Sequence, residues 1–310
     1  GMMTIVAILK RSMLFSFVSV KIAELTQGSP LKILILFSVV TGFLSAFLDN
    51  VTTVLIVIPI VIQLTAGMGL DPKIYVISQA VISNIGGTAT LIGDPPNIII
   101  GSKVGLTFNQ FVFNLAIPVL IAMCAAMLFI WITNRDKFKP VNTDLTKLFS
   151  FQLLLEKIRN EFLSITIDKM FVCKSLACLA IAIGLFVTQT ITRISPGVAS
   201  IFVAMLLFVI SKANVEQMLE DIEWNTLLFF FCFFIMIGIL ETKGVIEWLA
   251  HHVFLRVGNN PYLIVLVVLW TTGISSGFLD NIPFTIAMIP IVNRMQESNP
   301  IPNNILWWAL

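Results

Sequence analysis

The sequence predicts an all-α integral membrane protein whose helices are interrupted by re-entrant hairpins and by breaks at membrane depth. Hydrophobic residues make up 57% of the chain and charged residues only 12%, and the mean hydropathy is +0.97. Soluble domains are typically about 45–50% apolar and about 25% charged. Because so few charges cannot cover a protein surface in water, we expect the lipid bilayer to be the solvent.

Apolar runs along the chain predict the membrane spans. Crossing a hydrocarbon core of about 30 Å takes about 20 apolar residues in a helix. Two further segments of mixed polarity, 13–25 and 245–257, are predicted to lie along the membrane interface. The runs that come nearest to spanning length are 111–133, 175–190, 198–211 and 225–240.

Two other apolar stretches do not fit a simple span, because each is interrupted by a polar pair. Neither leaves room for a loop outside the membrane between two full spans, so each predicts a re-entrant hairpin. Non-helical backbone at membrane depth is tolerated only against protein or a water-filled cavity. The pairs are Asp49-Asn50 in the hairpin 31–64 and Asp280-Asn281 in the hairpin 261–295.

An internal repeat relates these two hairpins. At a constant offset of 231 residues, the segment from Thr4 to Val61 matches a later segment without gaps. Apolar chains often look alike by chance, but chance does not place Asp-Asn, Gly and Pro at one offset. Gly42, Ser45, Asp49, Asn50 and Pro59 are matched by Gly273, Ser276, Asp280, Asn281 and Pro290.

The distribution of basic residues predicts the topology. The stretch from Arg135 to Lys174 holds eight Lys or Arg and five acidic residues, which favours a cytoplasmic position under the positive-inside rule. Counting spans outward places the two copies of the repeat in opposite orientations, an arrangement typical of secondary transporters. At the same offset the counterpart of Ser83 falls beyond Leu310, so we expect the second copy to be truncated.

The predicted organisation has three parts. The first repeat, 1–133, holds an interfacial helix, the hairpin 31–64, a broken helix at 73–104 and the span 111–133. A basic cytoplasmic linker, 134–174, follows. The second repeat, 175–310, holds the spans within 175–240 and the hairpin 261–295.

Three carboxylates lie within apolar stretches, namely Asp49, Asp94 and Asp280. An ionisable residue at the bilayer centre costs about 2.5–3.5 kcal/mol on insertion scales, which favours a functional role. The structural alternative is that Asp49 and Asp280 cap the second arms of their hairpins, because Asp is a good N-cap. Capping and ion binding are compatible, since a cap lies where the helix end points toward the site.

A second polar group follows the first hairpin, where Gly86-Gly87 and Pro95-Pro96 interrupt an apolar segment. Proline lacks a backbone N–H, and the residue before it is pushed out of the α region. This pattern predicts a discontinuous helix whose freed carbonyls hold a cation together with side-chain oxygens; a kinked helix without a ligand is the alternative. The predicted site residues here are Asn84, Gly86, Gly87, Thr88, Thr90, Asp94, Pro95, Pro96 and Asn97.

Other functions find little support. The net charge of +2 is too small to indicate nucleic-acid binding. The chain has no Walker motif for ATP, so we expect no cofactor beyond a coupling ion, Na⁺ or H⁺. The side chains expected to ligate Na⁺ are those of Asn50, Asn84, Thr88 and Asn281.

The strings FLDNVTTVLIVIPI and SNIGGTATLIGDPPNIIIGS resemble the ArsB/NhaD group of the ion transporter superfamily. That group includes arsenite permeases, sodium/proton antiporters, the P protein and, more distantly, citrate and dicarboxylate carriers. The resemblance implies a scaffold domain, a mobile transport domain, two hairpins, two broken helices and usually a homodimer that works by an elevator-like movement. We expect the protein to lie in the plasma membrane.

Carried over by position, the resemblance assigns the binding residues. Asp49-Asn50 with Thr52 and Thr53 would form the first hairpin tip, and Gly86 to Asn97 the first broken helix. Asp280-Asn281 with Thr285 would form the second tip. Pro283-Phe284 replaces Thr52-Thr53 in the second copy, so the two half-sites cannot be chemically identical.

These features favour ion-coupled antiport of Na⁺ or arsenite against protons, with Asp49 and Asp280 binding and releasing the protons. Na⁺-coupled uptake of a carboxylate such as citrate is the alternative, although only Lys103 supplies a cation near the motifs. An intramembrane aspartyl protease would need two aspartates facing each other, whereas here each aspartate sits beside Asn at a break. A membrane subunit that does not transport is a further alternative.

Overall fold

The computed structural model describes residues 1–11, 14–138, 156, 169–211, 222, 224–245, 248, 260–278, 281–298 and 305–310. Over these residues the chain is helical and contains no strand, which confirms the predicted all-α class. The helices form two compact units. Unit 1 comprises Gly1–Asp94 and Thr107–Ile222, and unit 2 comprises Pro95–Leu106 and Glu223–Leu310. The two units are defined by contacts, whereas the two repeats were predicted from sequence similarity and orientation. The boundaries of the repeats therefore stay a prediction.

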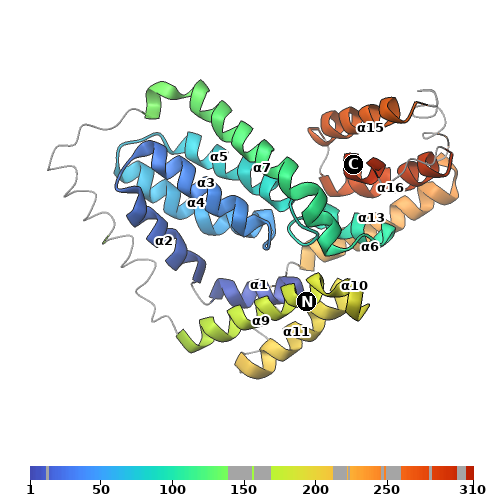
Figure 1. Ribbon diagram of the computed structural model, residues 1–310, viewed down its shortest axis with the longest axis horizontal. Coiled ribbons are helices and arrows are strands. Elements are labelled where there is room, and N and C mark those ends of the chain that lie inside the picture. Colours follow the sequence, from blue (N-terminus) through green and yellow to red (C-terminus); the bar gives the residue numbers. More distant parts are fainter. Residues whose placement is uncertain are drawn as a thin grey trace. The chain divides into compact units, whose positions relative to one another are not determined.

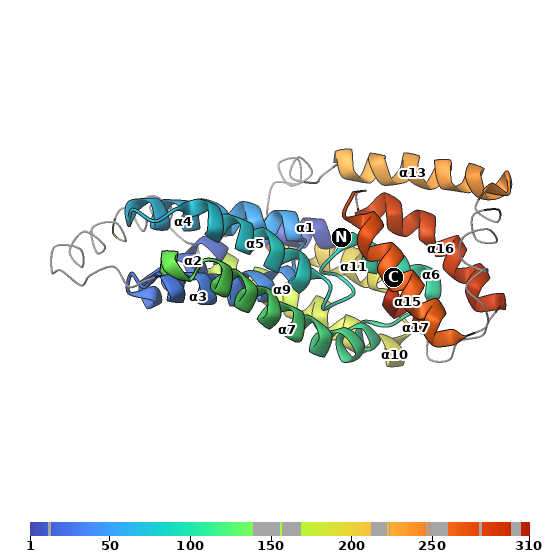
Figure 2. The ribbon, with the colours of Figure 1, turned by 90° about the horizontal axis from the view of Figure 1, so that it is seen from above.

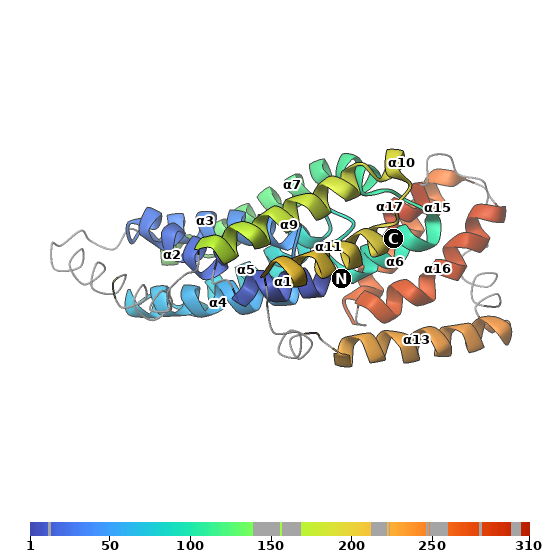
Figure 3. The same cartoon turned by 90° about the horizontal axis from the view of Figure 1, so that it is seen from below.

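Unit 1 holds the first hairpin and the helices around it. In Figure 1, α3, α4 and α5 lie side by side, and α7 lies along α5. A second group, formed by α1, α9 and α11, packs together in the same unit (Figure 3). The helices of unit 1 are α1 (Met2–Arg11), α2 (Leu14–Thr26), α3 (Pro30–Ser45), α4 (Asn50–Gly67), α5 (Pro72–Gly87), α7 (Phe108–Thr133), η1 (Arg135–Phe138), α9 (Lys169–Val187), α10 (Gln189–Thr192) and α11 (Pro196–Ser211).

Unit 2 holds the second hairpin, formed by α15 and α16. Helix α16 contacts α6, α13 and α15 within this unit, and the short α17 packs against α15 (Figure 2). The chain thus places α6, which follows the first broken segment, in the same unit as the second hairpin. Its helices are α6 (Pro95–Val104), α13 (Trp224–Thr242), α15 (Pro261–Ser276), α16 (Asn281–Ser298) and α17 (Ile305–Ala309).

Three of the described helices are long and apolar enough to cross a membrane: α4, α7 and Met170–Val187 within α9. Helix α4 continues to Gly67, past the predicted end of the hairpin, and the hydroxyl of Thr65 donates to the Val61 carbonyl inside it. Its 18 residues correspond to about 27 Å. This arm is therefore longer than the sequence pattern indicated.

The surface of α7 carries large apolar side chains that are exposed. Phe111 and Met123 are buried on the side toward its neighbours, whereas Phe113 is 81% exposed and Phe129 is 70% exposed. Such large apolar side chains face outward along most of the helix. Exposure on this scale is unfavourable in water but is what a lipid-facing helix requires.

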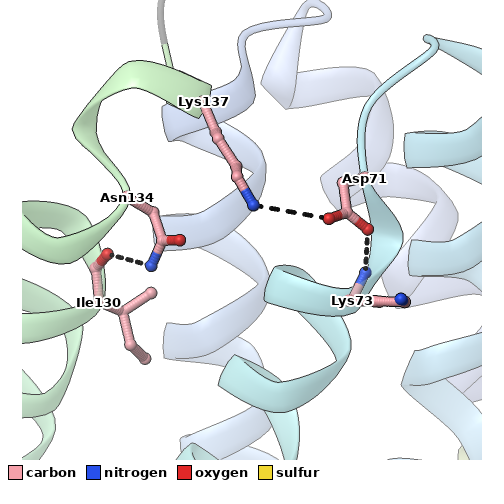
Figure 4. A network of polar contacts seen from close by, with 5 residues as sticks. All are labelled: Asp71, Lys73, Ile130, Asn134 and Lys137. Carbon is pink, nitrogen blue, oxygen red and sulfur yellow. Dashed lines mark hydrogen bonds and ion pairs between the residues drawn. The ribbon is translucent and has the colours of Figure 1, made fainter.

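The end of α7 is fastened to the first hairpin through η1. Phe138 is buried and meets the ring of Tyr75 edge-on, with the ring centroids 5.9 Å apart. The Tyr75 hydroxyl donates to the Pro30 carbonyl over 3.3 Å. Beside this contact Lys137 Nζ lies 3.6 Å from Asp71 Oδ2 (Figure 4). The end of α7 therefore lies beside the starts of α3 and α5.

We expect the aromatic contact, rather than the ion pair, to hold η1 in place. A buried Phe→Ala substitution typically costs about 3–5 kcal/mol, so Phe138→Ala should clearly lower the thermal midpoint in detergent. The pair of Lys137 and Asp71 is exposed, and exposed pairs contribute about 0–1 kcal/mol, so Lys137→Met should shift the midpoint little. Thermal denaturation of the purified variants measures both shifts, and a larger loss for Lys137→Met would contradict this assignment.

Candidate functional site

The first hairpin turns at Asp49, which is the N-cap of α4. Its backbone is extended, and its Oδ1 accepts a hydrogen bond from the Thr52 N–H over 3.0 Å. Its carbonyl accepts from the N–H of Thr53 over 3.1 Å and from the Thr53 hydroxyl over 3.0 Å. The Asn50 Oδ1 accepts from the Val51 N–H over 2.9 Å. The capping role predicted for Asp49 is confirmed, and the side chains of the two tip residues accept from two N–H groups of the first turn of α4, those of Val51 and Thr52.

The hairpin tip is joined to the end of α5 by an amide pair. Asn50 Nδ2 donates to Asn84 Oδ1 over 2.6 Å. Thr88 follows Asn84 by one helical turn, so both lie on the same side of α5, and both are exposed. The Thr88 hydroxyl donates to the Ile85 carbonyl over 2.5 Å. Two segments that are more than thirty residues apart in the sequence thus present their polar groups at one corner of unit 1.

Glycines allow α3, which leads into the hairpin tip, to lie very close to α5. A Cβ built on Gly86 would lie only 2.6 Å from the Cα of Gly42, so the backbones of α5 and α3 touch. A Cβ on Gly93 would lie 2.7 Å from the Ser45 carbonyl oxygen, and one on Gly87 would lie 3.1 Å from the Gly93 carbonyl oxygen. Side chains at these positions would push the hairpin tip away from the end of α5.

The predicted break of the helix is present. Helix α5 ends at Gly87, residues 88–94 form turns, and α6 begins at Pro95. The Thr90 hydroxyl, which is buried, donates to the Ala46 carbonyl at the end of α3 and accepts from the Gly93 N–H over 3.1 Å. The carboxylate-bearing residue Asp94 is also buried. The break therefore folds back onto the base of the hairpin tip.

Unit 1 thus brings together one group of the predicted site residues. Asp49 and Asn50 are half-buried, Thr52 is half-buried and Thr53 is buried. No group of three or more His, Cys, Asp or Glu that could hold a metal ion occurs in the described part of the chain. A cation here would be held mainly by neutral oxygens. The group comprises Asp49, Asn50, Thr52, Thr53, Asn84, Gly86, Gly87, Thr88, Thr90 and Asp94.

Unit 2 contains the other predicted residues. Pro96 and Asn97 are buried at the start of α6, after Pro95, and Thr285 is buried in α16. The Asn281 Oδ1 accepts from the Ser276 hydroxyl over 2.8 Å, a bond within the second hairpin. Asp280 lies outside the described residues. The second tip is thus tied to its own hairpin, whereas the first is tied to a neighbouring helix.

Some residues around the site were not predicted from the sequence. Thr41 and Gln79 pair in the interior of unit 1, and the Ser45 hydroxyl donates to the Ser83 carbonyl over 2.6 Å. Polar residues that recur every three to four positions in an otherwise apolar helix indicate one polar face. This spacing was the available signal for them.

An apolar helical bundle in which a hairpin tip contacts the end of a broken helix is the arrangement typical of a secondary membrane transporter. A family model described as "Citrate transporter" matches residues 1–310. The chain belongs to this citrate transporter family, and the predicted resemblance is confirmed.

Similar proteins include transporters from mycobacteria. An uncharacterized transporter of Mycobacterium tuberculosis is 34% identical over 314 residues, which cover 100% of this chain and 71% of that protein. The 46 kDa membrane protein of Mycobacterium leprae is 34% identical over 312 residues, with the same two coverages of 100% and 71%. The P protein of Homo sapiens is 27% identical over 383 residues, covering 100% of this chain and 45% of that protein.

The glycine contact gives a direct test of the site's construction. Alanine at Gly86 would overlap the backbone of Gly42, and overpacking typically costs about 1–3 kcal/mol, so the thermal midpoint should fall. The matched control is Gly184→Ala in α9, where a Cβ would meet nothing within 4 Å. Because alanine is a better helix former by about 1 kcal/mol, this control should be neutral or stabilising. Equal midpoints for the two variants would contradict the close approach.

Proposed function

We propose that this chain is an ion-coupled secondary transporter and that the first hairpin tip and the end of α5 hold the coupling cation. The distribution of charge and partial charge at this corner supports a cation rather than an anion. A helix N-terminus is ordinarily a binding site for anions, because its first N–H groups have no partner. At α4 the side chains of Asn50 and Asp49 already accept from the N–H groups of Val51 and Thr52, and the Asp49 carboxylate adds negative charge, so this helix start is poorly suited to an anion.

The opposite helix end favours a positive charge. Helix α5 ends at Gly87, facing the break, and the carbonyl end of a helix carries partial negative charge. Half-helix C-termini and unwound carbonyls are typical Na⁺ ligands in transporters. Neither the tip region 42–53 nor the break 83–97 contains Lys or Arg. Together with the carboxylate of Asp49 and the amide oxygen of Asn84, this corner is electrostatically suited to a cation.

The chemistry that follows is exchange of the cation with protons. Na⁺ would take the amide oxygen of Asn84 in place of the hydrogen bond from Asn50, while protonation of Asp49 would remove the negative charge that attracts the ion. Cation and proton would therefore compete for one site. Such competition would couple Na⁺ movement to proton movement in the opposite direction, so antiport of Na⁺ against protons is the leading function. Antiport of arsenite against protons, the other exchange that the sequence favours, draws no support from a cation site because arsenite is not a cation.

A second candidate is favoured by the family itself. The matching family model is described as a citrate transporter, and the same cation site could drive uptake of a carboxylate. We therefore retain Na⁺-coupled citrate or dicarboxylate transport as the second candidate. In this case the cation would stay bound during transport and would not exchange with protons.

The expected membrane orientation follows from the basic linker. The end of α7 lies beside the starts of α3 and α5, so the open end of the first hairpin faces the side on which the linker begins. At this level the Arg135 guanidinium lies 5.4 Å from the centroid of the Trp131 ring, and both residue types favour the membrane interface. We propose that this side is cytoplasmic, that the membrane is the plasma membrane and that the transporter is a homodimer.

The decisive substitution is Asp49→Asn, which keeps a good N-cap but removes the charge. Na⁺/H⁺ exchange, measured with a pH-sensitive dye in proteoliposomes, should be lost while the thermal midpoint stays within a few degrees. The control is Asp71→Asn, because Asp71 also caps its helix through its side chain but lies at the start of α5. Exchange should persist in the control. Undiminished exchange in Asp49→Asn would rule out the proposed site.

A solute screen distinguishes the two candidates. Na⁺, Li⁺, arsenite and citrate are added in turn to proteoliposomes, and both internal pH and labelled citrate are followed. Antiport predicts a pH change with Na⁺ or arsenite alone, because proton movement is tied to that ion. Citrate that accumulates only in a Na⁺ gradient, without a pH change from Na⁺ alone, would favour the second candidate.

A further inference from the structure

A buried polar ladder joins α3 and α5 just below the candidate site. Its side chains recur at helical spacing, so each set lies on one face of its helix. Each of them is at most 1% exposed. The ladder residues are Ser38, Thr41 and Ser45 on α3 and Gln79 and Ser83 on α5.

The amide of Gln79 lies at the centre of this ladder. Its Oε1 accepts from the Thr41 hydroxyl over 2.7 Å, and its Nε2 donates to the Ser38 hydroxyl over 3.5 Å. One further rung is the bond from Ser45 to the Ser83 carbonyl. The neighbouring Ser78 is equally buried but donates only to the Ile74 carbonyl of its own helix over 2.6 Å. The side chain of Gln79 therefore bonds to α3, whereas the hydroxyl of Ser78 bonds within α5.

These bonds add a directional constraint to the axial register of α3 on α5. Apolar side chains resist sliding only through the fit of their shapes, and the contact between Gly42 and Gly86 limits how close the helices come. A buried amide, by contrast, loses its partners as soon as one helix slides along the other. Leaving such groups unpaired is costly in a low-dielectric interior. Together with the glycine contact, the ladder therefore holds the axial register of α3 on α5.

The register matters because the site lies close above the ladder. Gln79 precedes Asn84 by five residues of helix, which is about 7.5 Å. A slip of α3 by one residue is about 1.5 Å. A displacement of this size, carried through the short turn to Asn50 at the start of α4, would break its 2.6 Å bond to Asn84.

We propose that Gln79 is a positioning residue for the cation site. Through Thr41 it holds α3 in register with α5 and so brings Asn50 to Asn84, without touching the ion itself. The effect of Gln79 on cation binding rests on the proposed function. Its effect on the register of α3 on α5 does not.

The test separates register from stability with a double substitution. Thr41→Val leaves the Gln79 Oε1 without its partner, and Gln79→Met removes the partner of the Thr41 hydroxyl and the donor to Ser38, so each should lower the thermal midpoint. The combined variant replaces the 2.7 Å pair with apolar groups of similar shape, so its midpoint should recover for the most part. A role in stability alone would recover with it, whereas the register would still lack its central bond. Ser78→Ala is the matched control.

The register of α3 on α5 is measured through the rate at which a disulfide forms between positions 50 and 84. In a background without Cys124, Cys173, Cys178 and Cys232, the pair Asn50→Cys and Asn84→Cys is oxidised and the rate of disulfide formation is measured. We expect the rate to stay about tenfold lower in the combined variant, because a misplacement near 1 Å strongly slows a reaction between positioned groups. The Ser78→Ala control should react at the unmodified rate.

The apparent affinity for Na⁺ is measured in the protein that keeps Asn50 and Asn84. The Na⁺ concentration for half-maximal exchange should rise about tenfold in the combined variant, by more than the maximal rate falls. Recovery of disulfide rate and Na⁺ affinity together with the midpoint would overturn the positioning role. If Na⁺ elicits no exchange in the unmodified protein, the proposed function fails, while the disulfide rates still decide whether Gln79 sets the register.

Discussion

The contact of α3 with α5 is the constraint on which the first unit depends. Gly42 and Gly86 let the two backbones touch, and in an apolar solvent close backbone packing replaces the hydrophobic effect as a source of helix association. The hairpin tip and the broken end of α5 can meet only because this contact is so short. The position of the hairpin tip beside α5 is thus favoured by two glycines near the ends of the helix pair.

Local chemistry made much of this arrangement predictable. The polar pair Asp49-Asn50 predicted the turn of the hairpin, and Gly86-Gly87 with Pro95-Pro96 predicted the break, because both act on the backbone at their own positions. The structure places these features as expected, with α4 beginning at Asn50 and α6 at Pro95. The repeat further indicated that the second hairpin would resemble the first, and α15 and α16 have the same lengths as α3 and α4.

Contacts between distant segments could not be predicted in the same way. The pairing of Thr41 with Gln79 joins residues 38 positions apart, and nothing in either local pattern names the other partner. The ring contact between Phe138 and Tyr75 could not be predicted either. A single aromatic residue after a span belongs to no periodic pattern that would indicate its partner. The two tips also bond differently, although the sequence repeat matches Asn50 with Asn281.

The bonds at the two tips differ in what they join. In the first hairpin the Asn50 amide donates to Asn84 of another helix, and in the second the Asn281 amide oxygen accepts from Ser276 of its own hairpin. Asn84 therefore loses a partner whenever the first tip moves away from it. A rearrangement at this corner of unit 1 thus involves α4 and α5 together, and neither helix end can change its polar contacts alone.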